Sequence, residues 1–236
     1  MLARLAEDVS TETRSRAPTA LGRPLSRSEL VADAWVHALG IAASMAGFAI
    51  LMVLAVRQDS TVSRVSLILY GGALTAMIGC SALYNVRHES PNKALFRRID
   101  HAAIFVMIAG TYTPFLAVKI GGAWGIGLLA YVWLIAGAGV AVKLLYFPSI
   151  ERFSIILYLF LGWTILAAPG PLFASISLPA IILLVAGGVL YSVGVLFHLL
   201  DQLAYSQAIW HCFVIAAAGC HYIAVLGDVA LPGAFA

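Results

Sequence analysis

The sequence predicts an all-α, polytopic membrane protein: a bundle of seven transmembrane helices with the N-terminus in the cytoplasm and the C-terminus outside. Of the 236 residues, 62% are hydrophobic and only 11% are charged, which is far more apolar than a water-soluble domain of this size. The apolar residues gather in runs of about 20, the length that a helix needs to cross a hydrocarbon core of about 30 Å. The runs are continuous and do not alternate, which disfavours the shorter strands of a β-barrel.

Seven apolar runs are predicted to be the membrane helices. They cover residues 32–56, 64–86, 99–118, 122–145, 153–169, 177–200 and 208–227. Residues 1–28 are polar and rich in Ser, Thr, Arg and Pro, which predicts a disordered cytoplasmic tail. This tail lacks the apolar core of a cleavable signal peptide, so the first helix is expected to direct insertion. Residues 29–227 form the predicted membrane domain, and residues 228–236 form a short outside tail.

The distribution of positive charge predicts the orientation. With the N-terminus inside, only Arg57, Arg64 and Lys119 of the 14 Lys and Arg residues fall outside, a strong positive-inside pattern. The net charge of +3 therefore indicates topology and contact with anionic headgroups, not a nucleic-acid surface. We expect a multi-pass protein of the cell (inner) membrane, with membrane lipids as partners and no nucleic acid.

The three cysteines lie inside apolar runs, where free Cys behaves as a small hydrophobe. They are Cys80, Cys212 and Cys220. Their positions match neither a disulfide framework nor a CxxC metal motif. We therefore expect no disulfide-linked partner, and the oligomeric state stays open.

Polar residues recur near the cytoplasmic ends of the predicted helices. Ionisable residues are costly within a membrane and are functional candidates by default. Three pairs have a spacing of four residues, which places both members on one helix face. These pairs are Asp33 and His37, Ser81 and Asn85, and Gln207 and His211. Asp100 and His101 open the third predicted helix, and His198 closes the sixth.

Helix caps and interfacial anchors are a sufficient explanation for Glu29, Asp201 and His88. Caps alone do not require pairs on one face. We therefore expect a polar site on the cytoplasmic side, which could be covered from the first helix by His37. Its expected members are Ser81, Asn85, Asp100, Gln207 and His211.

Four segments, in order, resemble a known family. They are "SELVADAWVHALG" in the first helix, "SALYN" at the end of the second, "FRRIDHAAIFVMIAGTYTPF" leading into the third, and "LDQLAYSQAIWHCFVIAAAGCHY" leading into the seventh. Through them, about residues 27–226 resemble the haemolysin III-like (bacterial) branch of the progestin and adipoQ receptor family. The resemblance implies seven membrane helices with the N-terminus inside.

The resemblance also implies a zinc site near the cytoplasmic face. The family pattern is Ser-x-x-x-His in the second helix, an aspartate that holds the metal-bound water, and His-x-x-x-His in the seventh helix. At these positions the sequence has Ser81, Asn85, Asp100, Gln207 and His211. Two of the three histidines are thus replaced by amides, whose oxygens are weak ligands for zinc.

We therefore expect a hydrogen-bonded polar network in place of the metal centre, because Asn and Gln can donate as well as accept. The alternative is a metal site rebuilt around Asp100 with His101, His198 or His88. His221 lies about 15 Å from His211 along the helix, and we expect it to make an isolated interhelical hydrogen bond.

Two functions follow from the resemblance. The first is a non-enzymatic protein that senses or adjusts membrane lipid composition through the polar pocket. The second is a metal-dependent, ceramidase-like hydrolase of lipid amides, in which Ser81 would stabilise the oxyanion and Asp100 would orient the water. The two missing ligands favour the first.

Other membrane functions fit less well. A secreted cytolysin must be soluble before insertion, which this composition opposes. A retinal receptor is excluded because no Lys follows Lys143. Transport stays open, although no pathway of paired charges reaches the outer leaflet.

Overall fold

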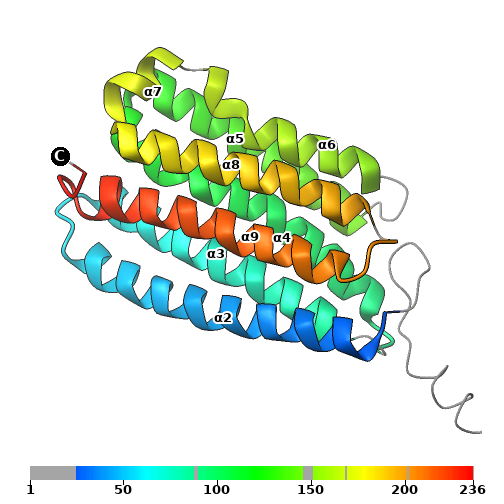
Figure 1. Cartoon of the computed structure of the whole chain (residues 1–236). Coiled ribbons are helices and arrows are strands. Elements are labelled where there is room, and N and C mark those ends of the chain that lie inside the picture. Colours follow the sequence, from blue (N-terminus) through cyan, green and yellow to red (C-terminus); the bar gives the residue numbers. More distant parts are fainter. Residues whose placement is uncertain (1–24, 88–89, 146–150, 168, 201, 236) are drawn as a thin grey trace, which may run out of the picture.

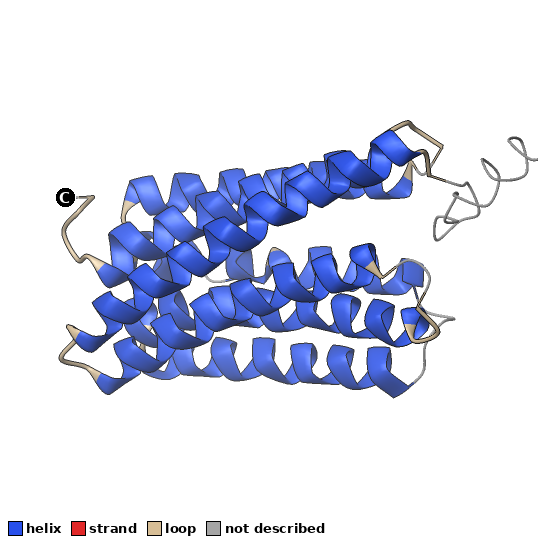
Figure 2. Cartoon of the chain, turned by 90° about the horizontal axis from the view of Figure 1, so that it is seen from below, coloured by secondary structure: helices blue, strands red, loops and turns tan. Residues whose placement is uncertain are grey.

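The structure, a computed structural model, describes residues 25–87, 90–145, 151–167, 169–200 and 202–235. Every regular element of these residues is a helix (Figure 2). The long helices run side by side along one axis, and α2 begins at the end of the bundle opposite the C-terminus (Figure 1). The helices are α2 (Arg27–Val56), α3 (Thr61–Val86), α4 (Lys93–Pro114), η1 (Phe115–Ile120), α5 (Gly122–Leu145), α6 (Glu151–Gly162), η2 (Thr164–Ala167), α7 (Pro169–Ser175), α8 (Leu178–Leu199), α9 (Ser206–Val225) and η3 (Leu226–Ala230).

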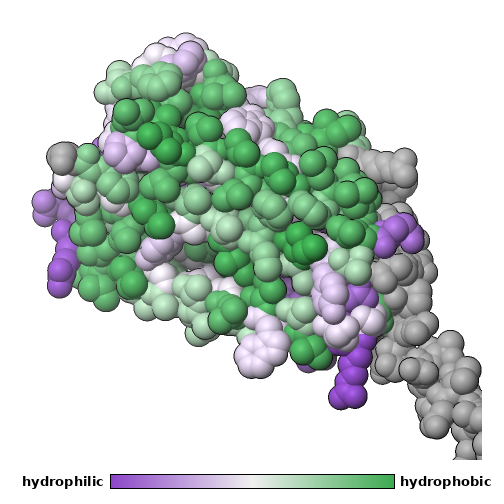
Figure 3. Space-filling model, in the orientation of Figure 1, coloured by the Kyte–Doolittle hydropathy of each residue, from purple (hydrophilic) through white to green (hydrophobic). Residues whose placement is uncertain are grey.

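Within the part of the chain that the structure describes, six helical segments are long and apolar enough to cross a bilayer. They are Arg27–Val56, Thr61–Val86, Lys93–Ile120, Gly122–Leu145, Leu178–Leu199 and Ser206–Ala230. Large apolar side chains such as Trp35, Leu134 and Phe160 are exposed. Hydrophobic residues cover most of the face seen in Figure 3, and hydrophilic residues gather toward the ends of the bundle. The chain is therefore an all-α, multi-pass membrane protein.

The fifth expected helix, 153–169, is wrong as a single continuous element. α6 ends at Gly162, the 3₁₀ helix η2 follows, and α7 starts at Pro169. Pro169 and Pro171 lack the N–H that a continuing helix needs. The apolar helix Phe153–Gly162 is shorter than a membrane span. A seventh crossing by the whole broken segment stays a prediction.

α4 begins at Lys93, earlier than the expected start at residue 99. Asp100 and His101 therefore lie about two turns inside the helix and do not open it as expected. The polar segment before the apolar run contains Lys, Ala, Leu and Arg, all good helix formers, so the helix begins outside the apolar run.

The last membrane helix also extends beyond its expected end at residue 227. α9 continues as the π-helix η3 to Ala230, where Asp228 is buried. A carboxylate oxygen of Asp228 lies 3.5 Å from Nζ of Lys119 in η1. The ion pair joins two helix ends on the side of the bundle away from the start of α2.

α2 packs closely against α9 through small residues. The buried face of α2 repeats every three or four residues and consists of Glu29, Asp33, His37, Gly40, Ser44, Gly47, Leu51 and Ala55. A Cβ atom on Gly40 would lie 2.9 Å from Ile215, and one on Gly47 would lie 2.9 Å from the ring of Tyr222. This close approach brings the polar first turns of α2 against the first turns of α9.

Candidate functional site

Glu29 joins the starts of α2 and α9. Ser26 and Glu29 form a capping box, in which Oγ of Ser26 accepts from the backbone N of Glu29 at 3.3 Å and Oε2 of Glu29 accepts from the backbone N of Ser26 at 2.8 Å. The other oxygen, Oε1, accepts from the backbone N of Tyr205 at 2.9 Å. Tyr205 is the N-cap of α9 and has a left-handed backbone, with φ 59°. Glu29 is thus more than the helix cap expected from the sequence, because it fixes α9 beside α2.

Asp33, one turn after Glu29, faces two imidazoles. Its Oδ1 lies 2.6 Å from Nδ1 of His211 on α9. Its backbone oxygen lies 2.9 Å from Nδ1 of His37, and its Oδ2 lies 3.4 Å from the same nitrogen. A backbone carbonyl only accepts, so Nδ1 of His37 donates. All three residues are buried, and the two imidazole rings pack edge to face with centroids 4.3 Å apart.

The hydroxyl of Ser81 lies at the meeting point of these side chains. Its Oγ is 3.1 Å from Nε2 of His37 and 3.4 Å from Nε2 of His211. Because Nδ1 of each ring faces Asp33, each ring presents Nε2 to the same serine oxygen. Asp100 of α4 lines the same cavity as Ser81. Ser81 therefore contacts polar groups from α2 and α9, and Asp100 lies at the same site.

Asn85 and Gln207 extend this network at the same end of the bundle. Nδ2 of Asn85 donates to the backbone oxygen of Ser81 at 2.9 Å and to its Oγ at 3.4 Å. Nε2 of Gln207 donates to Oδ1 of Asn85. The bond from Gln207 orients the Asn85 amide so that its nitrogen faces Ser81. The two amides thus satisfy each other and the serine.

His101 and His198 line the same cavity as this cluster, and His221 lies farther along α9. Nδ1 of His101 is 3.4 Å from Nζ of the buried Lys143, and its backbone oxygen accepts from the hydroxyl of Tyr158 at 2.8 Å. The ring of His198 packs against Trp210, with centroids 5.4 Å apart. His221 makes the expected interhelical hydrogen bond, with Nε2 3.2 Å from the backbone oxygen of Leu184.

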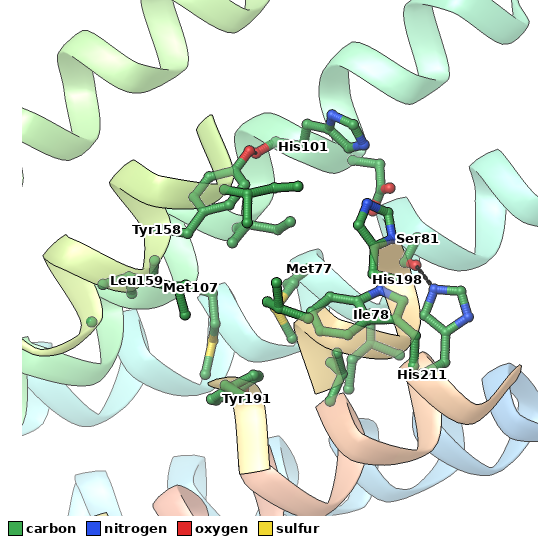
Figure 4. A pocket seen from close by; sticks show the side chains of 18 of the residues that line it. Met77, Ile78, Ser81, His101, Met107, Tyr158, Leu159, Tyr191, His198 and His211 are labelled. Carbon is green, nitrogen blue, oxygen red and sulfur yellow. Dashed lines mark hydrogen bonds between the residues drawn. The ribbon is translucent and has the colours of Figure 1, made fainter. Parts of the chain in front are cut away.

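A cavity of about 600 Å³ opens beside Ser81. Its lining includes the polar cluster and continues between the helices along apolar and aromatic side chains. These include Met77, Ile78, Met107, Tyr158, Leu159, Tyr191 and Val214. Figure 4 shows Ser81, His198 and His211 on one side of the cavity, with Met107, Tyr158 and Leu159 across from them. The volume lies in the range of small-molecule sites.

Four of the five residues expected to form the site, Ser81, Asn85, Gln207 and His211, are joined by hydrogen bonds. The fifth, Asp100, lines the same cavity. The structure adds Asp33 and His37 as direct partners of His211 and Ser81, a closer role than the cover expected from the first helix. His101 and His198 line the same cavity. Asp201, His88 and most of the predicted N-terminal tail lie outside the described residues. In the sequence, Glu29, Asp33 and His37 are four residues apart, and this spacing indicates that they share one face of α2.

Two sets of side chains are candidates for holding a metal ion. The positions implied by the resemblance do not fit a three-histidine zinc centre, because the amides of Asn85 and Gln207 bond to each other. A different group, Asp33, His37 and His211, offers one ligand atom from each residue with all three atoms within 4.8 Å of one another. Two imidazoles and one carboxylate are a ligand set used for divalent transition metals.

Fold and site together define a polytopic helical membrane protein with a cluster of Ser, His and Asp side chains at one end of a cavity between the helices. The sequence model of the family described as Haemolysin-III related matches residues 27–222. The chain belongs to the haemolysin III family, which is related to the progestin and adipoQ receptors.

Curated relatives cover most of the chain. "Hemolysin-3" of Bacillus cereus is 34% identical over 198 residues, or 84% of this chain and 90% of that protein. "Hemolysin-3 homolog" of Bacillus subtilis (strain 168) is 34% identical over 199 residues, or 84% and 93%. "Monocyte to macrophage differentiation factor" of Homo sapiens is 27% identical over 204 residues, or 84% and 83%.

Proposed function

We propose that this protein resides in the cell membrane, binds a membrane lipid in its central cavity and acts in lipid homeostasis or sensing. The observation that carries the proposal is the cavity of about 600 Å³, which joins a polar cluster at one end to apolar and aromatic walls. A lipid has the same division, since its acyl chain needs apolar contacts and its carbonyl or headgroup needs hydrogen-bond partners.

The positive-inside pattern supports placing the polar cluster in the cytoplasmic leaflet. Three helix ends that carry the cluster lie together at the end of the bundle opposite the C-terminus (Figure 1). They are the start of α2, the end of α3 and the start of α9. The side chains of the cluster hydrogen-bond to one another, so the protein can keep the site folded without a metal. This supports a lipid-binding role that requires no catalysis.

Tryptophan substitutions on adjacent residues of α8 test lipid binding. Val195 lines the cavity, whereas its neighbour Leu196 is 57% exposed and is absent from the lining. Lipids that stay bound through detergent purification should be counted by mass spectrometry. Val195→Trp should lower the retained lipid per chain several-fold, and Leu196→Trp should leave it at the wild-type level. Equal retention in wild type and both variants would contradict the proposal.

A metal-dependent hydrolase of lipid amides is the second candidate function. The observation that favours it is the group of ligand atoms from Asp33, His37 and His211. Elemental mass spectrometry of the purified protein tests it directly. Stoichiometric zinc or iron that is lost in His37→Gln would support this candidate, and a metal-free protein that still retains lipid would count against it.

A further inference from the structure

We propose that Ser81 is a nucleophile for an ester of a membrane lipid, with His37 as its base and Asp33 as the residue that positions the base. The inference rests on the proposed lipid-binding function, because the same cavity would present the ester. It departs from the metal-dependent candidate, since the reacting atom would be a side-chain oxygen of the protein. The contacts of Ser81, His37 and Asp33 carry the argument.

These contacts resemble a serine, histidine and aspartate triad, except that the hydrogen bond from Nδ1 goes to the backbone oxygen of the aspartate, with its carboxylate close by. Oγ of Ser81 lies 3.1 Å from Nε2 of His37, and Nδ1 of His37 donates to the backbone oxygen of Asp33, with the carboxylate 3.4 Å away. The backbone bond fixes the tautomer in which Nε2 of neutral His37 carries a lone pair. That nitrogen is therefore prepared to take the serine proton, as a general base must be.

His211 strengthens the arrangement from the opposite helix. Its Nδ1 lies 2.6 Å from the Asp33 carboxylate, and its Nε2 lies 3.4 Å from Oγ of Ser81. The Ser81 hydroxyl has one proton, so it can donate to only one of the two Nε2 atoms at a time. His211 holds the Asp33 carboxylate in place beside His37, and we assign it a positioning role.

Asn85 supplies a hydrogen-bond donor for the oxyanion. Its Nδ2 lies 3.4 Å from Oγ of Ser81, in a direction fixed by the bond from Gln207 to its Oδ1. An amide N–H beside the nucleophile can donate to the oxygen of a carbonyl that the serine attacks, as in an oxyanion hole. Asn85 would thus polarise the ester carbonyl, and Gln207 would hold the Asn85 amide in the orientation that this requires.

The chemistry balances with water as the co-reactant. Oγ of Ser81 forms a bond to the acyl carbon while its proton passes to Nε2 of His37. The ester C–O bond then breaks, and this proton moves to the leaving alcohol oxygen. Water next attacks the acyl-serine, gives its proton to Nε2 of His37, and the C–O bond to Ser81 breaks as the proton returns to Oγ. Asp100, which lines the same cavity as Ser81, would orient this water, and the products are an alcohol and a fatty acid.

Covalent labelling with a long-chain alkyl fluorophosphonate tests the inference on the full-length protein in lipid vesicles. Mass spectrometry should find about one adduct per chain on the peptide that contains Ser81, with and without a metal chelator. Ser81→Ala should abolish it. His37→Gln should lower the labelling rate constant by roughly 100-fold or more. Asp33→Asn should lower it less, because the backbone oxygen that accepts from His37 remains. The reversible affinity for the probe should change little in both variants.

Ser66→Ala is the matched control. Ser66 is buried and its hydroxyl bonds to the backbone oxygen of Val62, but it does not line the cavity. This variant should label at the wild-type rate. Reversible probe binding without an adduct on Ser81, or adducts spread evenly over several serines, would overturn the inference and leave lipid binding intact. Absence of reversible binding as well would overturn both proposals.

Discussion

Oδ1 of Asp33 lies 2.6 Å from Nδ1 of His211, although the two residues are 178 positions apart in the sequence. The contact joins the first turns of α2 to the first turns of α9 and is buried on both sides. It orients the imidazole whose other nitrogen faces Ser81. The Asp33–His211 contact therefore links the stability of the bundle to the geometry of the candidate site.

Removing the charge from this contact should destabilise the folded protein. Asp33→Asn keeps an oxygen that can accept a hydrogen bond but loses the carboxylate, so we expect a loss of about 1–2 kcal/mol, at the upper end for interhelical hydrogen bonds in membranes. Thermal unfolding in detergent measures it. Asp59→Asn, in the loop between α2 and α3 where Asp59 is exposed, should unfold like the wild type. Equal melting temperatures for all three proteins would contradict the prediction.

The bond between Gln207 and Asn85 should appear as coupling in a double-mutant cycle. Each single change to Leu leaves the other amide without its partner, at about 1–3 kcal/mol. The double variant should therefore be less destabilised than the sum of the single variants, by about 0.5–3 kcal/mol. The free energies come from unfolding of the four proteins in the same detergent. Strict additivity would show that the two amides do not interact.

Part of the fold follows directly from the sequence. Apolar runs alone predicted α2, α3, α5, α8 and α9, because spanning a membrane requires long apolar helices. They did not predict the break after Gly162 or the early start of α4. The prolines at 169 and 171 signalled the break, but the surrounding residues are apolar enough to resemble a continuous span. Polar helix formers before residue 99 extend α4 without changing the hydropathy of its span.

The sequence predicted which residues form the candidate site better than it predicted which of them contact each other. The spacing of four residues placed Ser81 with Asn85 and Gln207 with His211 on shared faces. The meeting of Asp33 with His211 depends on how closely α2 approaches α9, which Gly40 and Gly47 permit. Helix periodicity identifies such glycines as part of a buried face but does not identify the helix on the other side.

Placing histidines at the two positions that the resemblance implies for zinc ligands should create zinc binding. Asn85→His with Gln207→His would put two imidazoles where the amides now bond to each other. Position 207 lies one turn of α9 before His211. We expect about one zinc per chain in the double variant, because three histidines suit this metal. Elemental mass spectrometry of the wild type and both single variants provides the comparison. A folded double variant without additional zinc would show that these positions do not surround one site.

The orientation in the membrane has its own test. The positive-inside pattern predicts that a reporter fused near residue 10 is active in the cytoplasm, and that one fused near residue 234 is active outside. Alkaline phosphatase and green fluorescent protein fusions distinguish the two compartments. Both ends on the same side would contradict a seven-helix topology and show that the α6 to α7 segment does not complete a crossing.

Photo-cross-linking tests the central claim, lipid binding inside the bundle, most directly. The wild-type protein should be reconstituted with a phospholipid that carries a diazirine on its acyl chain, irradiated and mapped by mass spectrometry. The claim predicts adducts on Met77 and Met107, which line the cavity and are buried from the surface. Adducts confined to bilayer-facing residues such as Leu134, which is 73% exposed, would contradict it.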